Sequence, residues 1–538
     1  MTCKSIFTGV AVVFLSLWAE AQARLVREGG AVNLVVDGRP FLVLGGELGN
    51  SSASDMTYMA PFWDKFTAMH LNTILSPVYW ELMEPAEGRF DFSLVDSMVS
   101  AAERHGLRLI LLWFGSWKNS MSCYAPGWVK TNPERFPRAV NNAGHRMEIL
   151  SAFSENNLAA DCKAFGALMK HLRETDRSHT VIMVQVENEI GMLEAARERG
   201  AVADAAFGRS VPGELMRYLV AKKDSLVPEL RARWADAGFG VSGSWETVFG
   251  KGLNTEEIFQ AWYYARYANR VAEAGKAVYA LPMYVNAALN HRHVLPGQYP
   301  SAGPLPQVMD IWQAGAPAID LLSPDFYNPR FAWYCDLYVR RGNPLFIPEI
   351  RTEASNAAKV FYAVGHYHAL GFSPFSIESV VRPADEPVGK SYGILGQLMP
   401  ALAKGFAMDG VLLDSVGRSR VLVFGEYRLT VSHEYVLGWA PEAKLGNWPA
   451  SGAIVIEEAP GEFIVAGTGV VVEFAIAGGP VAGEEGRSVG ILRAEEGVYV
   501  DGVWRAGRRM NGDQDHQGRH IRIAVGDWAI QRVKLYTY

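Results

Sequence analysis

Hydrophobic and polar positions repeat in a regular order along the first three quarters of the chain. Short apolar runs rich in β-branched residues alternate with longer stretches whose apolar residues recur at helical spacing, as in residues 94–103. There are eight such runs, at residues 41–46, 71–75, 107–113, 180–187, 282–286, 319–323, 345–349 and 371–376. Strands buried on both faces and separated by helices pair in parallel, so the pattern predicts an α/β fold, a (β/α)8 TIM barrel.

The pattern changes after about residue 395. Short β-type runs with Gly, Asn and Asp between them replace the helical periodicity, at 411–413, 419–424, 427–433, 453–457, 462–466, 469–477, 498–503 and 521–525. These runs predict an all-β sandwich over residues 396–538. Such a domain either braces the barrel or binds polysaccharide, and the lack of a tryptophan ladder favours bracing.

One connection inside the barrel region is unusually long. About 90 residues separate the fourth run from the fifth, which predicts an insertion at about 190–280 over the mouth of a catalytic barrel that spans 24–395. Four aromatic residues there, Trp245, Trp262, Tyr263 and Tyr264, would either stack on sugar or pack the insertion's own core. Aromatic side chains serve mostly in cores, so packing is favoured.

Residues 1–23 are typical of a secretory signal. Lys4 precedes an apolar stretch from 6 to 18, and Ala21-Gln22-Ala23 has the form of a small-residue cleavage site. The apolar stretch is shorter than the roughly 20 residues that a membrane span needs. We therefore expect a mature chain that begins near Arg24, lies in the periplasm or outside the cell, and has no membrane partner.

Composition narrows the possible partners. The 538 residues are 49% hydrophobic and 20% charged, which is typical of water-soluble globular domains and too long for one core. The net charge of −6 and the lack of a dense Lys/Arg run argue against nucleic acid. The four cysteines, Cys3, Cys123, Cys162 and Cys335, form no CxxC pair or His/Cys cluster, so no metal or cofactor is predicted. One disulfide is possible and none is required, and no oligomeric state is indicated.

Two of the predicted strands end in a carboxylate. The run 180–187 leads into Glu187-Asn188-Glu189, and the run 345–349 ends at Glu349. Strands four and seven lie nearly opposite each other in an eight-stranded barrel, so Glu189 and Glu349 should face each other across the C-terminal mouth. Glycoside hydrolysis needs such a pair, with one carboxyl protonated and the other ionised. Arg351, two residues beyond Glu349, is expected to help keep it ionised.

Other residues near these ends are candidates for the site. Strand alternation gives Glu187 the same facing as Glu189, so Glu187 is an alternative catalyst or, more in keeping with its place, a supporting group. Asp325, Phe326 and Tyr327 follow the sixth run at the same mouth. Tyr327 either contacts Glu349 or the substrate, or serves in ordinary packing.

Several motifs resemble one enzyme family. Residues 71–74, 78–85 and 87–92 read LNTI, VYWELMEP and EGRFDF, and residues 184–191 read VQVENEIG. Together they resemble the motifs of family 35 glycoside hydrolases, the β-galactosidases, over roughly residues 40–400. The resemblance implies that Glu189 is the acid/base and Glu349 the nucleophile of a retaining mechanism. It also implies that Asn188 binds the 2-hydroxyl of the sugar and that Glu47, in Gly45-Gly46-Glu47, binds substrate.

The chain departs from the family pattern at positions where the family binds the sugar. Pro77 falls at the usual tyrosine and Met83 at the usual histidine. The segment 114–121 lacks the usual glutamate, and we expect Lys118, Asn119 and Trp117 to rebuild that subsite with other donors and a stacking face. These departures leave the identity of the sugar less certain than the chemistry.

The sequence thus favours a retaining exo-glycosidase that acts on a carbohydrate and releases terminal β-linked galactose, with xyloglucan-type hemicellulose as a candidate substrate. Two alternatives remain open. One is another retaining glycosidase of the same clan, such as an arabinofuranosidase or an endo-glucanase. The other is a carbohydrate-binding protein without catalysis.

Overall fold

The computed structural model describes residues 23–28, 31–290, 293–478 and 487–538. The predicted signal lies outside the described residues except for Ala23, which begins strand β1 (Ala23–Glu28). Strand β1 pairs with β2 (Ala31–Val36), and β2 turns into β3 (Arg39–Pro40) through Asp37 and Gly38, both at positive φ. Among the described helices, none combines the length and apolar character needed to span a membrane.

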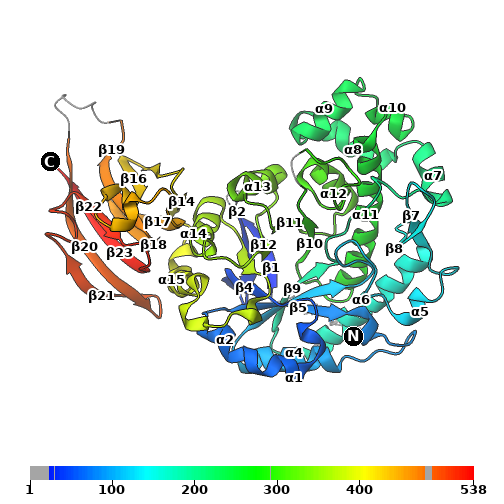
Figure 1. Cartoon of the computed structure of the whole chain (residues 1–538), viewed down its shortest axis with the longest axis horizontal. Helices are drawn as coiled ribbons and strands as arrows, with labels where there is room; N and C mark the ends of the chain where they lie inside the picture. The colour runs from blue at the N-terminus through cyan, green and yellow to red at the C-terminus, as the bar shows by residue number, and fades with distance from the viewer. Residues whose placement is uncertain (1–22, 29–30, 291–292, 479–486) are drawn as a thin grey trace, which may run out of the picture.

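Eight parallel strands close into a barrel, as the sequence predicted (Figure 1). In chain order they are β4 (Val43–Glu47), β5 (Thr73–Tyr79), β6 (Arg108–Phe114), β9 (Val181–Val186), β10 (Met283–Ala288), β11 (Leu321–Phe326), β12 (Ile347–Ile350) and β13 (Gly371–Pro374). Nearly every residue in them is buried, because helices cover the outer face of the barrel while side chains fill its interior.

The covering helices show why apolar residues recur at helical spacing. Helix α4 (Ser93–Arg104) buries Val95, Met98, Ala101 and Ala102, which lie on one face, while its polar residues are exposed. Other helices on the barrel are α6 (Glu155–Thr175), α11 (Leu253–Lys276), α12 (Met309–Gly315), α13 (Phe331–Tyr338), α14 (Asn356–Tyr367) and α15 (Pro387–Leu402). The α/β alternation of the sequence is thus the alternation of barrel strand and covering helix.

The long connection after β9 holds helices α7 (Ala201–Gly208), α8 (Gly213–Lys222), α9 (Pro228–Asp236) and α10 (Trp245–Phe249), at the right of Figure 1. It then passes into α11, which packs against α6. Trp245, Trp262 and Tyr264 are buried and Tyr263 is half-buried. The three buried residues therefore pack a core, as expected, but it is the core shared with the barrel rather than one belonging to the insertion alone.

The C-terminal region is a β-sandwich. One antiparallel sheet has the order β14 (Ala407–Leu413), β17 (Ser451–Ala459), β18 (Glu462–Thr468), β23 (Ala529–Thr537), β20 (Val489–Val500) and β21 (Val503–Met510). The other has β15 (Ser419–Phe424), β16 (Tyr427–His433), β19 (Val470–Ile476) and β22 (His520–Ile523). Leu429 and Val472 of the smaller sheet share a core with Val455 and Val465 of the larger one.

One predicted strand in this region is wrong. Residues 498–503 do not form a single strand, because Asp501 and Gly502 make a tight turn with φ of 50° and 72° between β20 and β21. Asp-Gly is the preferred pair for such a two-residue hairpin. The Asp-Gly pair in the sequence therefore indicates a turn at this point rather than a continuous strand.

The larger sheet packs against the barrel. Ile454, Ile456 and Ile464 belong to the same core as the barrel, on the sheet face that meets α14. A Cβ on Gly365 of α14 would lie only 2.8 Å from the Cα of Gly410 on β14, so glycine allows this close approach. The predicted boundary after residue 395 falls inside α15, whose Ser391 accepts a hydrogen bond from the Trp528 indole at 2.9 Å. These contacts are those of a bracing domain.

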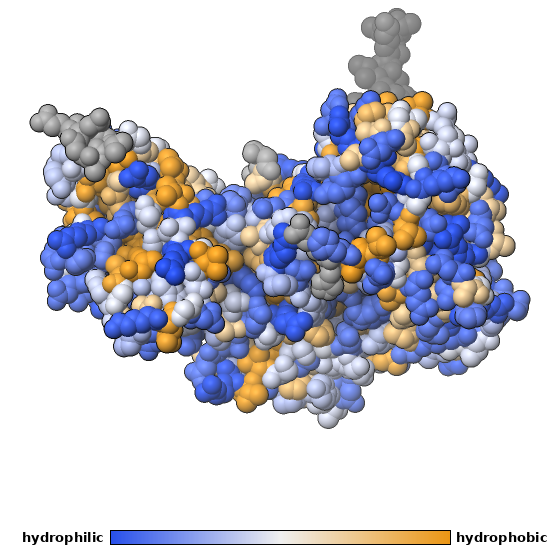
Figure 2. All heavy atoms as spheres, turned by 45° about the horizontal axis from the view of Figure 1, so that its top comes forward, coloured by the Kyte–Doolittle hydropathy of each residue, from blue (hydrophilic) through white to orange (hydrophobic). Residues whose placement is uncertain are grey.

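The face in Figure 2 is largely hydrophilic, and its hydrophobic side chains are spread in small groups over the barrel and the β-sandwich. Cys123, Cys162 and Cys335 are all unpaired, so the described part of the chain contains no disulfide.

Candidate active site

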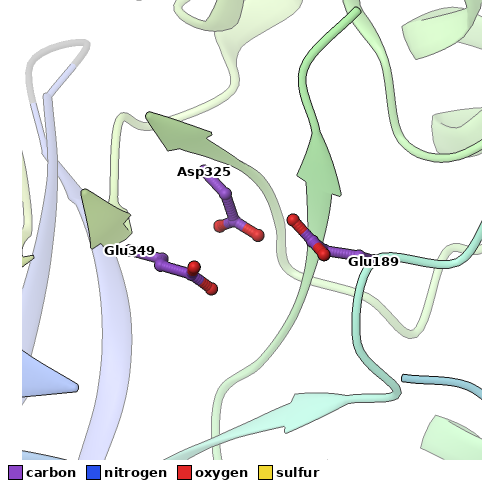
Figure 3. A group of neighbouring side chains, drawn as sticks. All are labelled: Glu189, Asp325 and Glu349. Carbon is purple, nitrogen blue, oxygen red and sulfur yellow. The ribbon is translucent and has the colours of Figure 1, made fainter. Parts of the chain in front are cut away.

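Four buried carboxyl groups meet at the C-terminal mouth of the barrel. Glu47 ends β4, Glu189 follows β9, Asp325 lies near the end of β11 and Glu349 lies in β12. Each is at most 5% exposed. One carboxyl oxygen from each of Glu189, Asp325 and Glu349 lies within 4.8 Å of the other two, and the three side chains point toward one another (Figure 3). The structure therefore brings Glu189 and Glu349 together as the sequence predicted.

Glu349 is held between opposing influences. Burial, and then the charge of Glu189, raise its pKa to about 7, while Lys118 and the Tyr327 hydroxyl favour the ionised form. The Tyr327 hydroxyl donates a hydrogen bond to Glu349 Oε1, so Tyr327 contacts the candidate nucleophile. The expected helper Arg351 is exposed and lies over the Tyr327 ring, 5.4 Å from its centroid. Lys118, rather than Arg351, is the cation that favours ionised Glu349.

Asp325 and Glu47 lie beside Glu189 and Glu349. Burial raises the pKa of Asp325 and of Glu47 well above the usual range, and the charge of Glu349 raises it further. The Asn286 amide donates to Asp325 Oδ2 at 2.6 Å and accepts from the Glu189 backbone N–H at 2.9 Å. Asn286 was not among the predicted site residues, although it is the last residue of a predicted strand, where barrel enzymes place functional groups.

The loop after β6 supplies the other contacts to Glu189. The Asn119 amide donates to Glu189 Oε2, and the Ser120 backbone N–H donates to the Glu189 carbonyl at 3.1 Å. Lys118 is 3% exposed. Trp117 is fully buried and packs its ring against Tyr264 and Tyr267. The expectation that Trp117 offers a stacking face to sugar is therefore wrong.

Asn188 has a buried side chain whose amide oxygen and nitrogen both lack a hydrogen-bond partner within the described residues. Leaving a buried polar group unpaired costs about 1–3 kcal/mol. A sugar hydroxyl, which both donates and accepts, would satisfy this amide. The geometry fits the binding role that the resemblance implies.

Glu187 does not share the facing of Glu189. Strand β9 ends at Val186, and φ is 62° at Glu187 and 45° at Glu189. The chain has left the β conformation at these residues, so strand alternation does not apply. Glu187 instead accepts a hydrogen bond from the Trp117 backbone N–H at 2.8 Å and is fully buried.

Three acids in one cluster also raise the question of a metal ion. Within the described ranges, Glu189, Asp325 and Glu349 form the one group whose oxygens converge closely enough to hold one. Oxygen ligands suit Mg²⁺ or Ca²⁺, which take six or more ligands. Burial, however, favours a proton on Asp325, and Lys118 already lies near Glu349. Protons and Lys118 balance the charge, and we assign no metal here.

Lys118 should control the acidic side of the pH profile. The predicted nucleophile Glu349 can attack only when it is ionised, so activity is expected to fall as the pH drops through the pKa of Glu349, about 7. Because Lys118 lowers that pKa, Lys118→Met should move the acidic limb of kcat/KM to higher pH and reduce kcat/KM about tenfold at pH 6. Lys118→Arg keeps the charge and should keep the limb. An unmoved limb in Lys118→Met would refute this role.

Comparisons with known proteins bear on part of this region. Residues 60–240 match the family model of glycoside hydrolase family 42, described as beta-galactosidase. The matching stretch is similar to beta-galactosidases. It contains Glu189 and ends before Glu349. Residues 388–522 match a second model, described as a domain of unknown function. The family 42 match and the resemblance to family 35 agree on beta-galactosidase and differ in the family.

Individual proteins are similar to parts of the chain. A beta-galactosidase of Xanthomonas manihotis is 30% identical over 164 residues, which are 29% of this chain and 25% of that protein. The solved beta-galactosidase of psychrophilic Marinomonas ef1 has a TM-score of 0.46 and 12% identity, over 67% of this chain and 62% of that chain. The catalytic domain of a beta-amylase from Paenibacillus polymyxa has a TM-score of 0.44 and 12% identity, over 66% and 98%. The family 42 match and the Xanthomonas manihotis match are both to beta-galactosidases, and the chain spans about a quarter of the length of the curated relative it matches.

Proposed function

We propose that the protein is a retaining glycoside hydrolase that releases terminal β-linked galactose. The observation that carries the proposal is the closeness of Glu189 and Glu349, one carboxyl oxygen of each lying within 4.8 Å of the other. Retaining enzymes hold their two carboxyl groups about 5–5.5 Å apart, whereas inverting enzymes leave roughly 6.5–9.5 Å for a water molecule. The spacing supports direct attack by one carboxylate on the sugar.

In the first step Glu349 attacks the anomeric carbon and forms an ester bond while the glycosidic bond breaks. Glu189 donates its proton to the departing oxygen. In the second step Glu189 takes a proton from water, the water oxygen attacks the anomeric carbon, and the ester bond to Glu349 breaks. Lys118 and Tyr327 favour ionised Glu349, which suits the nucleophile.

The sugar and the setting belong to the proposal as well. Galactose is supported by the match of residues 60–240 and by the relative in Xanthomonas manihotis. Glu47, Asn119, Asn188 and Tyr327 lie around the two catalytic candidates and would hold the sugar hydroxyls. Residues 1–23 have the composition of an export signal, so we place the enzyme in the periplasm or outside the cell. A galactose-bearing hemicellulose such as xyloglucan is a substrate it would meet there.

A panel of nitrophenyl glycosides tests the proposal. We expect hydrolysis of the β-galactoside to exceed that of the arabinoside and the fucoside, and free galactose as the sole sugar released from xyloglucan oligosaccharides. A faster arabinoside would point to an arabinofuranosidase. Cleavage inside a glucan chain would point to an endo-enzyme. Sugar binding without any product would point to a carbohydrate-binding protein.

A further inference from the structure

We propose that Asp161 and Glu187 form a buried positioning pair that fixes the loop carrying Glu189. The proposal rests on the proposed function, because it gives Glu189 the role of acid/base. Neither residue would touch the substrate. The pair would act through the backbone of two loops, one after β6 and one after β9.

The pair lies at the centre of a closed hydrogen-bond network. Asp161 is on the buried face of α6, among apolar residues. It accepts hydrogen bonds from the Trp113 indole at 2.9 Å, the Ser116 hydroxyl at 2.5 Å and the Tyr267 hydroxyl at 3.3 Å. Glu187 accepts from the Trp117 backbone N–H at 2.8 Å. An acid inside the apolar stripe of a helix is expensive unless it is fully hydrogen-bonded.

One proton completes the network. If both groups were carboxylates, Glu187 Oε1 would have no donor among the described residues. A proton on Glu187 would supply a hydrogen bond to the neighbouring Asp161, and burial together with the charge of Asp161 raises the pKa of Glu187 well above its usual range. Gly115 leaves room for this contact, since a Cβ there would come within 2.9 Å of Glu187 Oε1. In the proposed network Glu187 is a neutral hydrogen-bonding group.

The two loops are joined next to this pair. The Asn188 N–H donates to the Trp117 carbonyl at 3.2 Å, and the Ser120 N–H donates to the Glu189 carbonyl at 3.1 Å. The Asn119 amide donates to Glu189 Oε2. Glu187 accepts a hydrogen bond from the Trp117 N–H and so anchors the contact between Trp117 and Asn188. The contact from Asn119 then reaches the carboxyl group of Glu189.

The backbone at the junction needs such an anchor. Asn119, Ser120, Glu187 and Glu189 all have positive φ, at 48°, 67°, 62° and 45°. Residues with a Cβ avoid this region, so four of them together persist only where the surroundings hold them. Glu187 is itself part of this strained segment, and Asp161 neighbours its side chain. Without the pair we expect the loop to relax and Glu189 to leave its position.

Two substitutions at one position separate positioning from other roles. Glu187→Gln keeps an acceptor for Trp117 and a donor for Asp161, so kcat should stay within about threefold of wild type. Glu187→Ala removes both, and kcat should fall about 100-fold with KM nearly unchanged, the effect of misplacing a catalytic group by about 1 Å. Glu198→Ala is the matched control, because Glu198 is also a buried carboxyl, accepting from Ser151 at 2.7 Å. It should lose stability and keep kcat.

A crystal structure of Glu187→Ala tests the inference without any assay. We expect Glu189 turned away from Asn119 and at least one φ of the junction returned to negative values. An unmoved Glu189 would overturn the inference, and so would a Gln variant as damaged in kcat as the Ala variant. If the wild-type protein hydrolyses no glycoside, the proposed function fails, while the crystal structure still decides whether the pair positions Glu189.

Discussion

Glu349→Ala is expected to lower kcat on nitrophenyl β-galactoside by at least about 10⁴-fold, because the step that forms the ester bond loses its nucleophile. The substitution also leaves a small space beside the anomeric carbon. Azide should fit there and attack in place of the carboxylate, restoring release of nitrophenol. Only one displacement then occurs, so the product should be the α-galactosyl azide. Product analysis by NMR reads out this configuration.

The matched control for this variant is Glu353→Ala. Glu353 lies four residues further on, is exposed, and pairs with Lys359. Its loss should leave kcat within about twofold of wild type, since surface substitutions seldom matter. A Glu349→Ala protein that keeps its activity, or a β-galactosyl azide from it, would remove Glu349 from the role of nucleophile.

Glu189→Ala should produce a different pattern. Loss of a general acid costs about 10²–10⁴-fold, and the cost depends on how much the departing group needs a proton. Dinitrophenol leaves readily without one, so hydrolysis of its galactoside should be limited by the second step and should show a lowered KM. Galactosyl oligosaccharides, with poor leaving groups, should show the largest loss. Azide should give the β-galactosyl azide, after two displacements.

Glu194→Ala is the control for this second prediction. Glu194 is an exposed acid on the same loop and accepts a hydrogen bond from Asn141. It should leave the dependence on the leaving group unchanged. Equal losses for dinitrophenyl galactoside and oligosaccharide in Glu189→Ala would mean that Glu189 does not donate the proton.

The barrel could be predicted from sequence because its signal is repeated. Strands buried on both faces read as continuous apolar runs, and the carboxyl ends of all eight point to one mouth. Glu189 and Glu349 followed from that rule. Residues 498–503 show its limit. They are apolar enough for a strand, yet the Asp-Gly pair inside them turns the chain, and turn chemistry outweighs a short apolar run.

The interior of the site was harder to predict for two reasons. Side chains alternate between the two faces of a strand only while the chain stays extended. The positive φ of Glu187 shows that the strand ends two residues before Glu189, so alternation does not predict where Glu189 points. Contacts between distant segments leave no local trace. Asp161 of helix α6 meets Glu187 beyond β9, and Asn286 of β10 meets Asp325 of the neighbouring strand β11, and neither residue pair is marked in the sequence. Trp117 was assigned to the sugar for the same reason, because its burial depends on Tyr264 and Tyr267 of α11.

Trapping of the glycosyl-enzyme tests the central claim most directly. The reagent is a dinitrophenyl β-galactoside in which fluorine replaces the hydroxyl next to the anomeric carbon. The fluorine destabilises the charged transition states of both steps, so both become slower. Dinitrophenol is a good enough leaving group to keep the first step fast, so the ester forms quickly and is hydrolysed slowly. Peptide mass spectrometry then locates the sugar. We predict one fluorogalactosyl group, attached to Glu349. A label on Glu189, Asp325 or Glu187, or turnover of β-galactoside with an inverted product, would contradict the account.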